Sequence, residues 1–298
     1  MGFKSGFVTI IGRPNVGKST FMNHVVGQKI AIMSDKAQTT RNKIQAIYTD
    51  DQAQIIFIDT PGVHKPKHAL GEFMVNTAMQ SLKGVDAILV VVNATEKIGP
   101  GDRLVMDSTK GSNIPVFLLI NKIDLVHPND MLAIIESFTS EYDFDQVFPM
   151  SAKEGINTQA IIEKLIDVLP EGPQYYPANQ MSDHPEYFVA AEFIREKILY
   201  FTREELPHSV AVQVTKMRHN EDGEMEIEAT IIVERKSQKG MIIGKDGALI
   251  KKVRQLARKD IQNLLGEKVY LELWVKVQKN WRDQQSQLND LGYRPEDY

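Results

Sequence analysis

The stretch Gly12–Thr20, which reads GRPNVGKST, constrains the fold of this chain more than any other feature. It matches G-x-x-x-x-G-K-[ST], the pattern of a loop that wraps phosphate groups between a buried strand and a helix. Gly12 and Gly17 permit the tight turn, and N–H groups at the start of the next helix attract anions. The apolar run Phe7–Ile11 supplies the strand. We therefore expect a nucleotide-binding domain; a glycine turn that binds nothing is the alternative.

The first 170 residues alternate between apolar runs and helix-like segments. Continuous apolar runs predict parallel strands covered on both faces, and their alternation with helices predicts an α/β layered domain. We expect strands at Phe7–Ile11, Ile55–Ile58, Ala87–Val92, Val116–Ile120 and Val147–Met150, and helices at Phe21–Val26, Leu70–Leu82, Asp102–Lys110, Met131–Glu141 and Thr158–Val168.

Three short motifs are expected to hold the phosphates and Mg²⁺. Lys18 would neutralise the β- and γ-phosphates, and the Ser19 hydroxyl would hold the metal. Asp59, which opens Asp59-Thr60-Pro61-Gly62, would reach Mg²⁺ through water, and the Gly62 N–H would approach the γ-phosphate. A threonine between the first helix and the second strand would reach the metal only while the γ-phosphate is present. We choose Thr40 over Thr39 and assign catalytic roles to Lys18, Thr40 and Gly62; a polar mobile loop is the alternative.

The nucleotide base is predicted from Asn121-Lys122-Ile123-Asp124, at the end of the fourth apolar run. The Asp124 carboxylate accepts hydrogen bonds from guanine N1–H and N2–H₂, an arrangement that adenine does not present. Ser151-Ala152-Lys153 would offer backbone N–H groups to guanine O6. GTP and GDP are therefore the expected ligands. The complete predicted set is Gly12, Arg13, Pro14, Asn15, Val16, Gly17, Lys18, Ser19, Asp59, Thr60, Pro61, Gly62, Val63, Asn121, Lys122, Ile123, Asp124, Ser151, Ala152 and Lys153.

The composition changes after residue 170, where Leu169–Pro177 carries four prolines or glycines. We expect a GTP-binding domain at 1–170, a linker at 171–183, a second domain at 184–280 and a tail at 281–298. The second domain has a helix–strand–strand–helix–helix–strand order with alternating strands, which predicts a small α+β domain. The chain has no cysteine and no 18-residue apolar run, so we expect no disulfide, no spanning helix and no signal peptide.

The second domain contains Gly244-Lys245-Asp246-Gly247, a G-x-x-G loop of the kind that clamps a nucleic-acid backbone between two helices. Residues 235–259 carry nine Lys or Arg and one Asp, a net +8 on a chain of net charge −4. Such a local basic patch favours nucleic-acid binding, although a helix–helix turn with a solvated basic face is the alternative. The predicted RNA-binding residues are Lys239, Gly244, Lys245, Asp246, Gly247, Lys251, Lys252 and Arg254.

These motifs in this order, GRPNVGKS, QTTR, DTPG, NKID and SAK followed by IIGKDG, resemble the Era family of bacterial GTPases over essentially the whole chain. The resemblance implies a phosphate-loop GTPase domain with a mixed, mostly parallel sheet, followed by a type II KH domain. It also implies binding of 16S rRNA near its 3′ end, a role in 30S subunit maturation, K⁺ held with the help of Asn15, and a cytoplasmic protein with peripheral association with the inner face of the cell membrane. We expect a monomer.

Val63 occupies the position where many GTPases carry a glutamine that orients the attacking water. The valine side chain cannot form a hydrogen bond to water, so we expect slow intrinsic hydrolysis of GTP. Two other functions remain open at this point. One is an RNA-modifying enzyme gated by the GTPase domain, although no modification site is apparent; the other is a scaffold that binds GTP without useful hydrolysis. An ATPase is disfavoured by Asp124.

Overall fold

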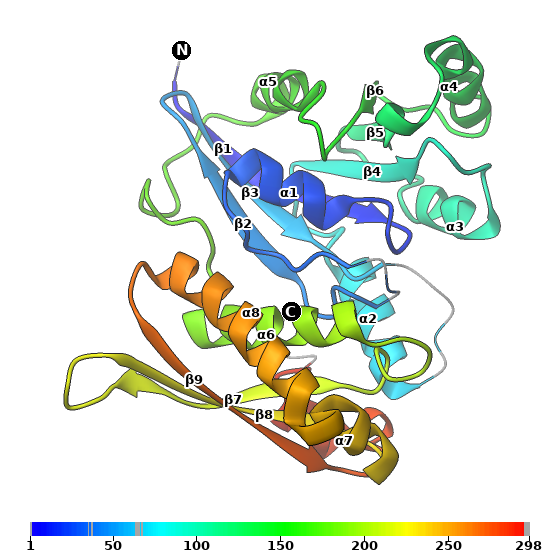
Figure 1. The fold of residues 1–298 in the computed structure, drawn as a ribbon. Coiled ribbons are helices and arrows are strands. Elements are labelled where there is room, and N and C mark those ends of the chain that lie inside the picture. The colour runs from blue at the N-terminus through cyan, green and yellow to red at the C-terminus, as the bar shows by residue number, and fades with distance from the viewer. Residues whose placement is uncertain (1, 35, 37, 63–65, 67, 295–298) are drawn as a thin grey trace.

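The computed structural model describes residues 2–34, 36, 38–62, 66 and 68–294. Within them, the N-terminal part forms a six-stranded sheet in the order β2-β3-β1-β4-β5-β6 (Figure 1). β2 pairs antiparallel with β3, and the other neighbours are parallel. The strands are β1 (Lys4–Gly12), β2 (Ile44–Thr49), β3 (Ala53–Asp59), β4 (Ala87–Asn93), β5 (Val116–Asn121) and β6 (Gln146–Met150).

Helices cover both faces of this sheet, which explains the continuous apolar runs of its inner strands. α1 and α5 pack on one face, and α2, α3 and α4 pack on the other. Every residue of β3, β4 and β5 is buried. The helices are α1 (Lys18–Val26), α2 (Ala69–Gln80), α3 (Pro100–Ser108), α4 (Met131–Thr139) and α5 (Thr158–Val168), with the short 3₁₀ turns η1 (Ile123–Leu125) and η2 (Pro128–Asp130).

The expected α/β architecture is confirmed, and its mixed character comes from β2. This strand was not predicted from its own residues, because its sequence IQAIYT is short and only half apolar. It lies at one edge of the sheet and is less completely buried than the inner strands, since Gln45, Tyr48 and Thr49 are only half-buried.

The C-terminal part forms a separate three-stranded sheet in the order β7-β8-β9, with β7 antiparallel and β9 parallel to β8. Helices α6 and α8 lie against this sheet and against each other (Figure 1). The α-β-β-α-α-β order is the one expected for the KH domain. The elements are α6 (Glu186–Phe201), β7 (Ala211–His219), β8 (Met225–Val233), α7 (Lys236–Ile243), η3 (Lys245–Gly247), α8 (Ala248–Leu265), β9 (Val269–Val277), η4 (Trp281–Asp283) and α9 (Gln285–Asp290).

The two sheets are joined by packed contacts as well as by the connecting chain. In that connection, Ser182 Oγ donates to the Gln45 carbonyl of β2 at 2.9 Å. The C-terminal segment packs on α2, where the fully buried Trp281 lies in one apolar cluster with Phe73 and Met74. Trp281 Nε1 donates to the Ser209 carbonyl at 3.0 Å. The end of the described chain therefore connects the second sheet to α2.

Candidate functional site

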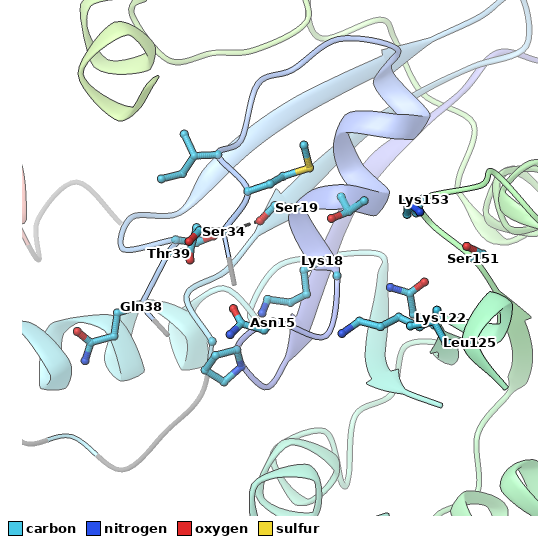
Figure 2. Close-up of a pocket in the computed structure, with 18 of the residues that line it drawn as sticks. Asn15, Lys18, Ser19, Ser34, Gln38, Thr39, Lys122, Leu125, Ser151 and Lys153 are labelled. Atoms are coloured by element: carbon cyan, nitrogen blue, oxygen red, sulfur yellow. Dashed lines mark hydrogen bonds between the residues drawn. The ribbon is translucent and has the colours of Figure 1, made fainter. Parts of the chain in front are cut away.

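A cavity of about 550 Å³ lies at the carboxyl ends of β1, β3, β5 and β6, where ligands bind in open α/β sheets. Figure 2 shows Lys122, Leu125, Ser151 and Lys153 on one side of it and Ser34, Gln38 and Thr39 on the other. The residues that line it are Pro14, Asn15, Gly17, Lys18, Ser19, Thr20, Ile32, Met33, Ser34, Gln38, Thr39, Thr40, Gly62, Asn121, Lys122, Asp124, Leu125, Ser151 and Lys153.

The glycine loop is shaped by a position where only glycine fits. Gly17 has φ of 105°, and a Cβ there would lie 2.1 Å from Asn121 Nδ2. The following helix α1 begins at Lys18, whose Nζ donates back to the carbonyls of Gly12 at 3.2 Å and Arg13 at 3.1 Å. Burial lowers the pKa of Lys18, and the charge of Asp59 partly offsets this. The loop thus holds a buried cation and a helix N-terminus against one cavity, as phosphate binding requires.

Three oxygen-bearing side chains meet beneath the loop. Ser19 Oγ donates to Asp59 Oδ2 at 2.6 Å, and Thr40 Oγ1 lies 3.2 Å from Ser19 Oγ and 3.4 Å from Asp59 Oδ2. Asp59 is fully buried, its Oδ1 has no partner, and burial raises its pKa. An orphaned carboxylate oxygen beside two hydroxyls is a hard oxygen donor set that fits Mg²⁺.

Imidazole and thiolate metals do not fit this donor set. Across the described ranges, no group of three or more His, Cys, Asp or Glu side chains is placed to hold a metal. A Mg²⁺ ion that is completed by phosphate oxygens and water needs no such group.

The motif after β3 approaches the glycine loop closely. A Cβ on Gly62 would lie 2.7 Å from the backbone nitrogen of Pro14, so only glycine allows this contact. Thr60 Oγ1 donates to the Ile10 carbonyl at 2.8 Å and fixes the turn to β1. Val63, which the sequence placed in the nucleotide set, lies outside the described residues.

At the other end of the cavity, Asn121 connects two loops. Its Nδ2 donates to the Val16 carbonyl at 2.8 Å, and its Oδ1 accepts from the Ala152 N–H at 2.9 Å. Asp124 follows at the cavity mouth and accepts from Ser151 Oγ at 2.6 Å. These bonds bring a carboxylate and the backbone of the loop after β6 to one place, as recognition of guanine requires.

Some predicted residues support the cavity without lining it. Arg13 points away: its guanidinium pairs with Glu96 at 2.5 Å and with Asp102 at 2.8 Å. The others that do not line the cavity are Gly12, Val16, Asp59, Thr60, Pro61, Ile123 and Ala152. The lining residues that were not in the predicted nucleotide set are Thr20, Ile32, Met33, Ser34, Gln38, Thr39 and Leu125. Only their position in or beside the motifs could have indicated them.

The G-x-x-G loop lies between α7 and α8, as expected. Gly244 and Gly247 have φ of 73° and 74°, and Asp246 between them is also left-handed at 52°. Lys245 and Asp246 are exposed, whereas Lys239 is half-buried. The glycines allow the left-handed turn that brings α8 directly after α7.

A second cavity, of about 500 Å³, lies along α8 beside β9. It is lined by Lys251, Arg254, Gln255, Arg258, Tyr270 and Leu271. Lys252 does not line it; its ammonium lies 4.7 Å from the centre of the Phe201 ring on α6. Arg258 was not predicted, although its spacing from Lys251 and Arg254 places all three on one helix face.

Comparisons with known proteins find matches to both parts of the chain. A family model described as 50S ribosome-binding GTPase matches residues 7–122, and a KH domain model matches residues 205–282. Two solved structures each have a TM-score of 0.94, 39% sequence identity, and coverage of 98% of this chain and 99% of theirs. One is a single-substitution variant of Aquifex aeolicus Era bound to GDP and AlF₄⁻. The other is Era in complex with MgGDPNP and nucleotides 1506–1542 of 16S ribosomal RNA.

Proposed function

The chain belongs to the Era family of GTPases, and we propose that it couples GTP hydrolysis to binding of the 3′ end of 16S rRNA and so assists maturation of the 30S ribosomal subunit. The observation that carries this proposal is the similarity over nearly the full length to an Era bound to that rRNA segment. The convergence of three nucleotide-type loops on one cavity supports the GTP half of it.

In the proposed mechanism, the chain stabilises charge and holds the reactants rather than supplying a covalent group. Lys18, buried at the loop, offsets the negative charge of the β- and γ-phosphates, and the Gly62 N–H binds a γ-phosphate oxygen. Asp124 selects guanine. Asn121 joins the glycine loop to the loop after β6 through its hydrogen bonds to Val16 and Ala152. The remaining predicted residues, Gly12, Arg13, Pro14, Asn15, Val16, Gly17, Asp59, Thr60, Pro61, Val63, Lys122, Ile123, Ser151, Ala152 and Lys153, shape or support this site.

Ser19, Thr40 and Asp59 are the proposed Mg²⁺ site. Their oxygens lie within 3.4 Å of one another, and the buried Asp59 carboxylate has an unpaired oxygen to offer. When bound, Mg²⁺ supplies positive charge that offsets charge on the phosphates. We also propose that Asn15, exposed in the glycine loop and lining the cavity, helps hold K⁺. With valine at position 63, the intrinsic rate should be slow.

RNA binding is assigned to the G-x-x-G loop and the basic face of α8. The RNA backbone would contact the loop residues Gly244, Lys245, Asp246 and Gly247. Positive charge to attract the RNA phosphates would come from Lys239, Lys251, Lys252 and Arg254. The cavity beside β9 adds Arg258 and the half-exposed Tyr270, whose ring offers a surface for base stacking.

We propose the division into a GTPase domain at 1–170, a linker at 171–183, a KH domain at 184–280 and a tail at 281–298, which the two separate sheets support. A cytoplasmic monomer with peripheral association with the inner face of the cell membrane stays a prediction from the family. No helix in the described ranges is long and apolar enough to cross a membrane. Flotation with vesicles and sedimentation of the purified protein test these points.

The proposed function is tested by binding an RNA of the 16S 3′-end sequence to the protein loaded with GDPNP or GDP. We expect the RNA to bind, and a scrambled RNA of equal length and charge to bind at least tenfold more weakly. Equal affinity for the two RNAs would reduce the second domain to a non-specific binder and contradict the proposal.

A further inference from the structure

The loop between α1 and β2 is held by the second domain on both sides of Thr40. On one side, the Arg195 guanidinium of α6 donates to the Thr39 carbonyl. Arg195 is fully buried, and its Nε donates to Glu192 Oε1 at 2.7 Å, which fixes the guanidinium plane. Burial lowers the pKa of Arg195, but the Glu192 carboxylate outweighs it and raises that pKa, so the group stays charged.

On the other side, Arg41 reaches from the GTPase domain into the second domain. Its Nη1 donates to the Val210 carbonyl at 2.7 Å, and its Nη2 donates to the carbonyls of Pro207 at 3.0 Å and His208 at 3.3 Å. The side chain is 1% exposed, and the guanidinium carbon lies 5.8 Å from the centre of the Trp281 ring. The residues before and after Thr40 are therefore both anchored outside the domain that contains the nucleotide cavity.

Thr40 lies between these two anchored residues. Thr40 Oγ1 lies 3.2 Å from Ser19 Oγ, within the oxygen cluster that fits Mg²⁺. α6 also binds the start of the same loop, because Glu196 Oε1 accepts from the Met33 N–H at 2.9 Å. α6 therefore contacts this loop at two places, Met33 and Thr39, the second of which directly precedes Thr40.

We propose that Arg195 is a positioning residue for GTP binding, which acts through the Thr39 carbonyl to place Thr40 at the metal site. The second domain is then a structural part of the GTP site, in addition to its role with RNA. Because a threonine in this loop contacts the metal only when the γ-phosphate is present, Arg195 favours GTP and leaves GDP unaffected. This role of Arg195 rests on the GTP-binding part of the proposed function and does not depend on RNA binding.

The test measures affinity for GDPNP and GDP, with Mg²⁺ titrations, in Arg195→Ala. This variant loses a hydrogen bond from a charged group that acts in the GTP-bound state. We therefore expect GDPNP to bind about tenfold more weakly and to need a higher Mg²⁺ concentration, whereas the affinity for GDP should change less than about twofold. Arg195→Lys keeps a buried charge beside Glu192 but loses the planar fork, so it should show the same selective loss to a smaller degree. Equal losses for GDP and GDPNP, or no loss, in these variants overturn the proposal.

Thr40→Ala completes a double-mutant cycle. If Arg195 acts through Thr40, Arg195→Ala adds nothing to the loss of GDPNP affinity caused by Thr40→Ala; additive losses contradict the proposal. Asp283→Ala is the matched control, since Asp283 joins the same domains away from this loop, where its Oδ1 accepts from the Ala69 N–H of α2 at 3.3 Å and lies 3.3 Å from His68 Nδ1. It should leave the GDPNP-to-GDP ratio unchanged. A selective GDPNP loss there would show that domain contact in general, rather than Arg195, positions Thr40.

Discussion

Asn121→Ala should disconnect the two ends of the nucleotide cavity. Asn121 is 3% exposed, and its amide satisfies the Val16 carbonyl and the Ala152 N–H at 2.8 and 2.9 Å. The alanine variant leaves both backbone groups without this partner. A buried polar group left unsatisfied costs about 1–3 kcal/mol. Water entering from the adjacent cavity relieves part of this, so we expect a loss of about 2–3 kcal/mol and a fall in Tm of about 4–12 °C.

The assay pairs thermal unfolding with titration of a fluorescent GDP at a temperature where all variants are folded. Asn93→Ala is the matched control: Asn93 is opposite Asn121 in the sheet register and 4% exposed, and its side chain hydrogen-bonds within its own turn, to Thr95 and Glu96. Both variants should lose stability, and only Asn121→Ala should lose GDP affinity. Equal GDP affinity in Asn121→Ala and the wild type would refute the assigned role.

Three further outcomes are expected. Asp124→Asn removes two charge-assisted hydrogen bonds to guanine, about 3 kcal/mol, so GTP should bind about 100-fold more weakly in competition assays while XTP, with a carbonyl at C2, gains. Lys251→Gln should weaken binding of all RNAs alike and lower the slope of log affinity against log salt by about one; an unchanged slope would separate Lys251 from the phosphates. Burial raises the pKa of Asp260, but hydrogen bonds from Lys197 and Lys29 outweigh this and lower it. Its stabilising effect is therefore complete above the unfolded-state pKa of about 3.9 and lost as pH falls below it, so Asp260→Asn should flatten the acid limb of stability measured by urea unfolding.

Much of the GTPase domain follows from local patterns. Strands such as β4 are buried on both faces, so their continuous apolar runs reveal them, and motif residues follow them directly. β2 escaped prediction because its partner β3 and the linker contact at Ser182, not its own residues, stabilise it at the sheet edge. Element order was sufficient to predict a small α+β domain, whereas its assignment as a KH domain came from the family resemblance.

Side-chain direction could not be predicted from motif membership. Arg13 belongs to the phosphate-loop pattern, yet Glu96 and Asp102, more than 80 residues later, turn its guanidinium away from the cavity. Lys252 belongs to the basic run of α8, yet Phe201 of α6 binds its ammonium. The contact between Arg195 and Thr39 spans 156 residues and belongs to no motif. In each case a partner that is distant in the sequence determines the direction of the side chain, and the fold brings that partner close.

The central claim is that one chain couples GTP hydrolysis to recognition of the 16S rRNA 3′ end. The most direct measurement is the rate of GTP hydrolysis with and without that RNA, in the wild type and in a Lys245→Gln/Lys251→Gln variant that leaves the nucleotide cavity intact. We predict that RNA accelerates hydrolysis in the wild type and that the variant loses this acceleration while keeping its basal rate. If RNA binds the wild type and leaves turnover unchanged, the two sites are merely on the same chain and the claim is wrong.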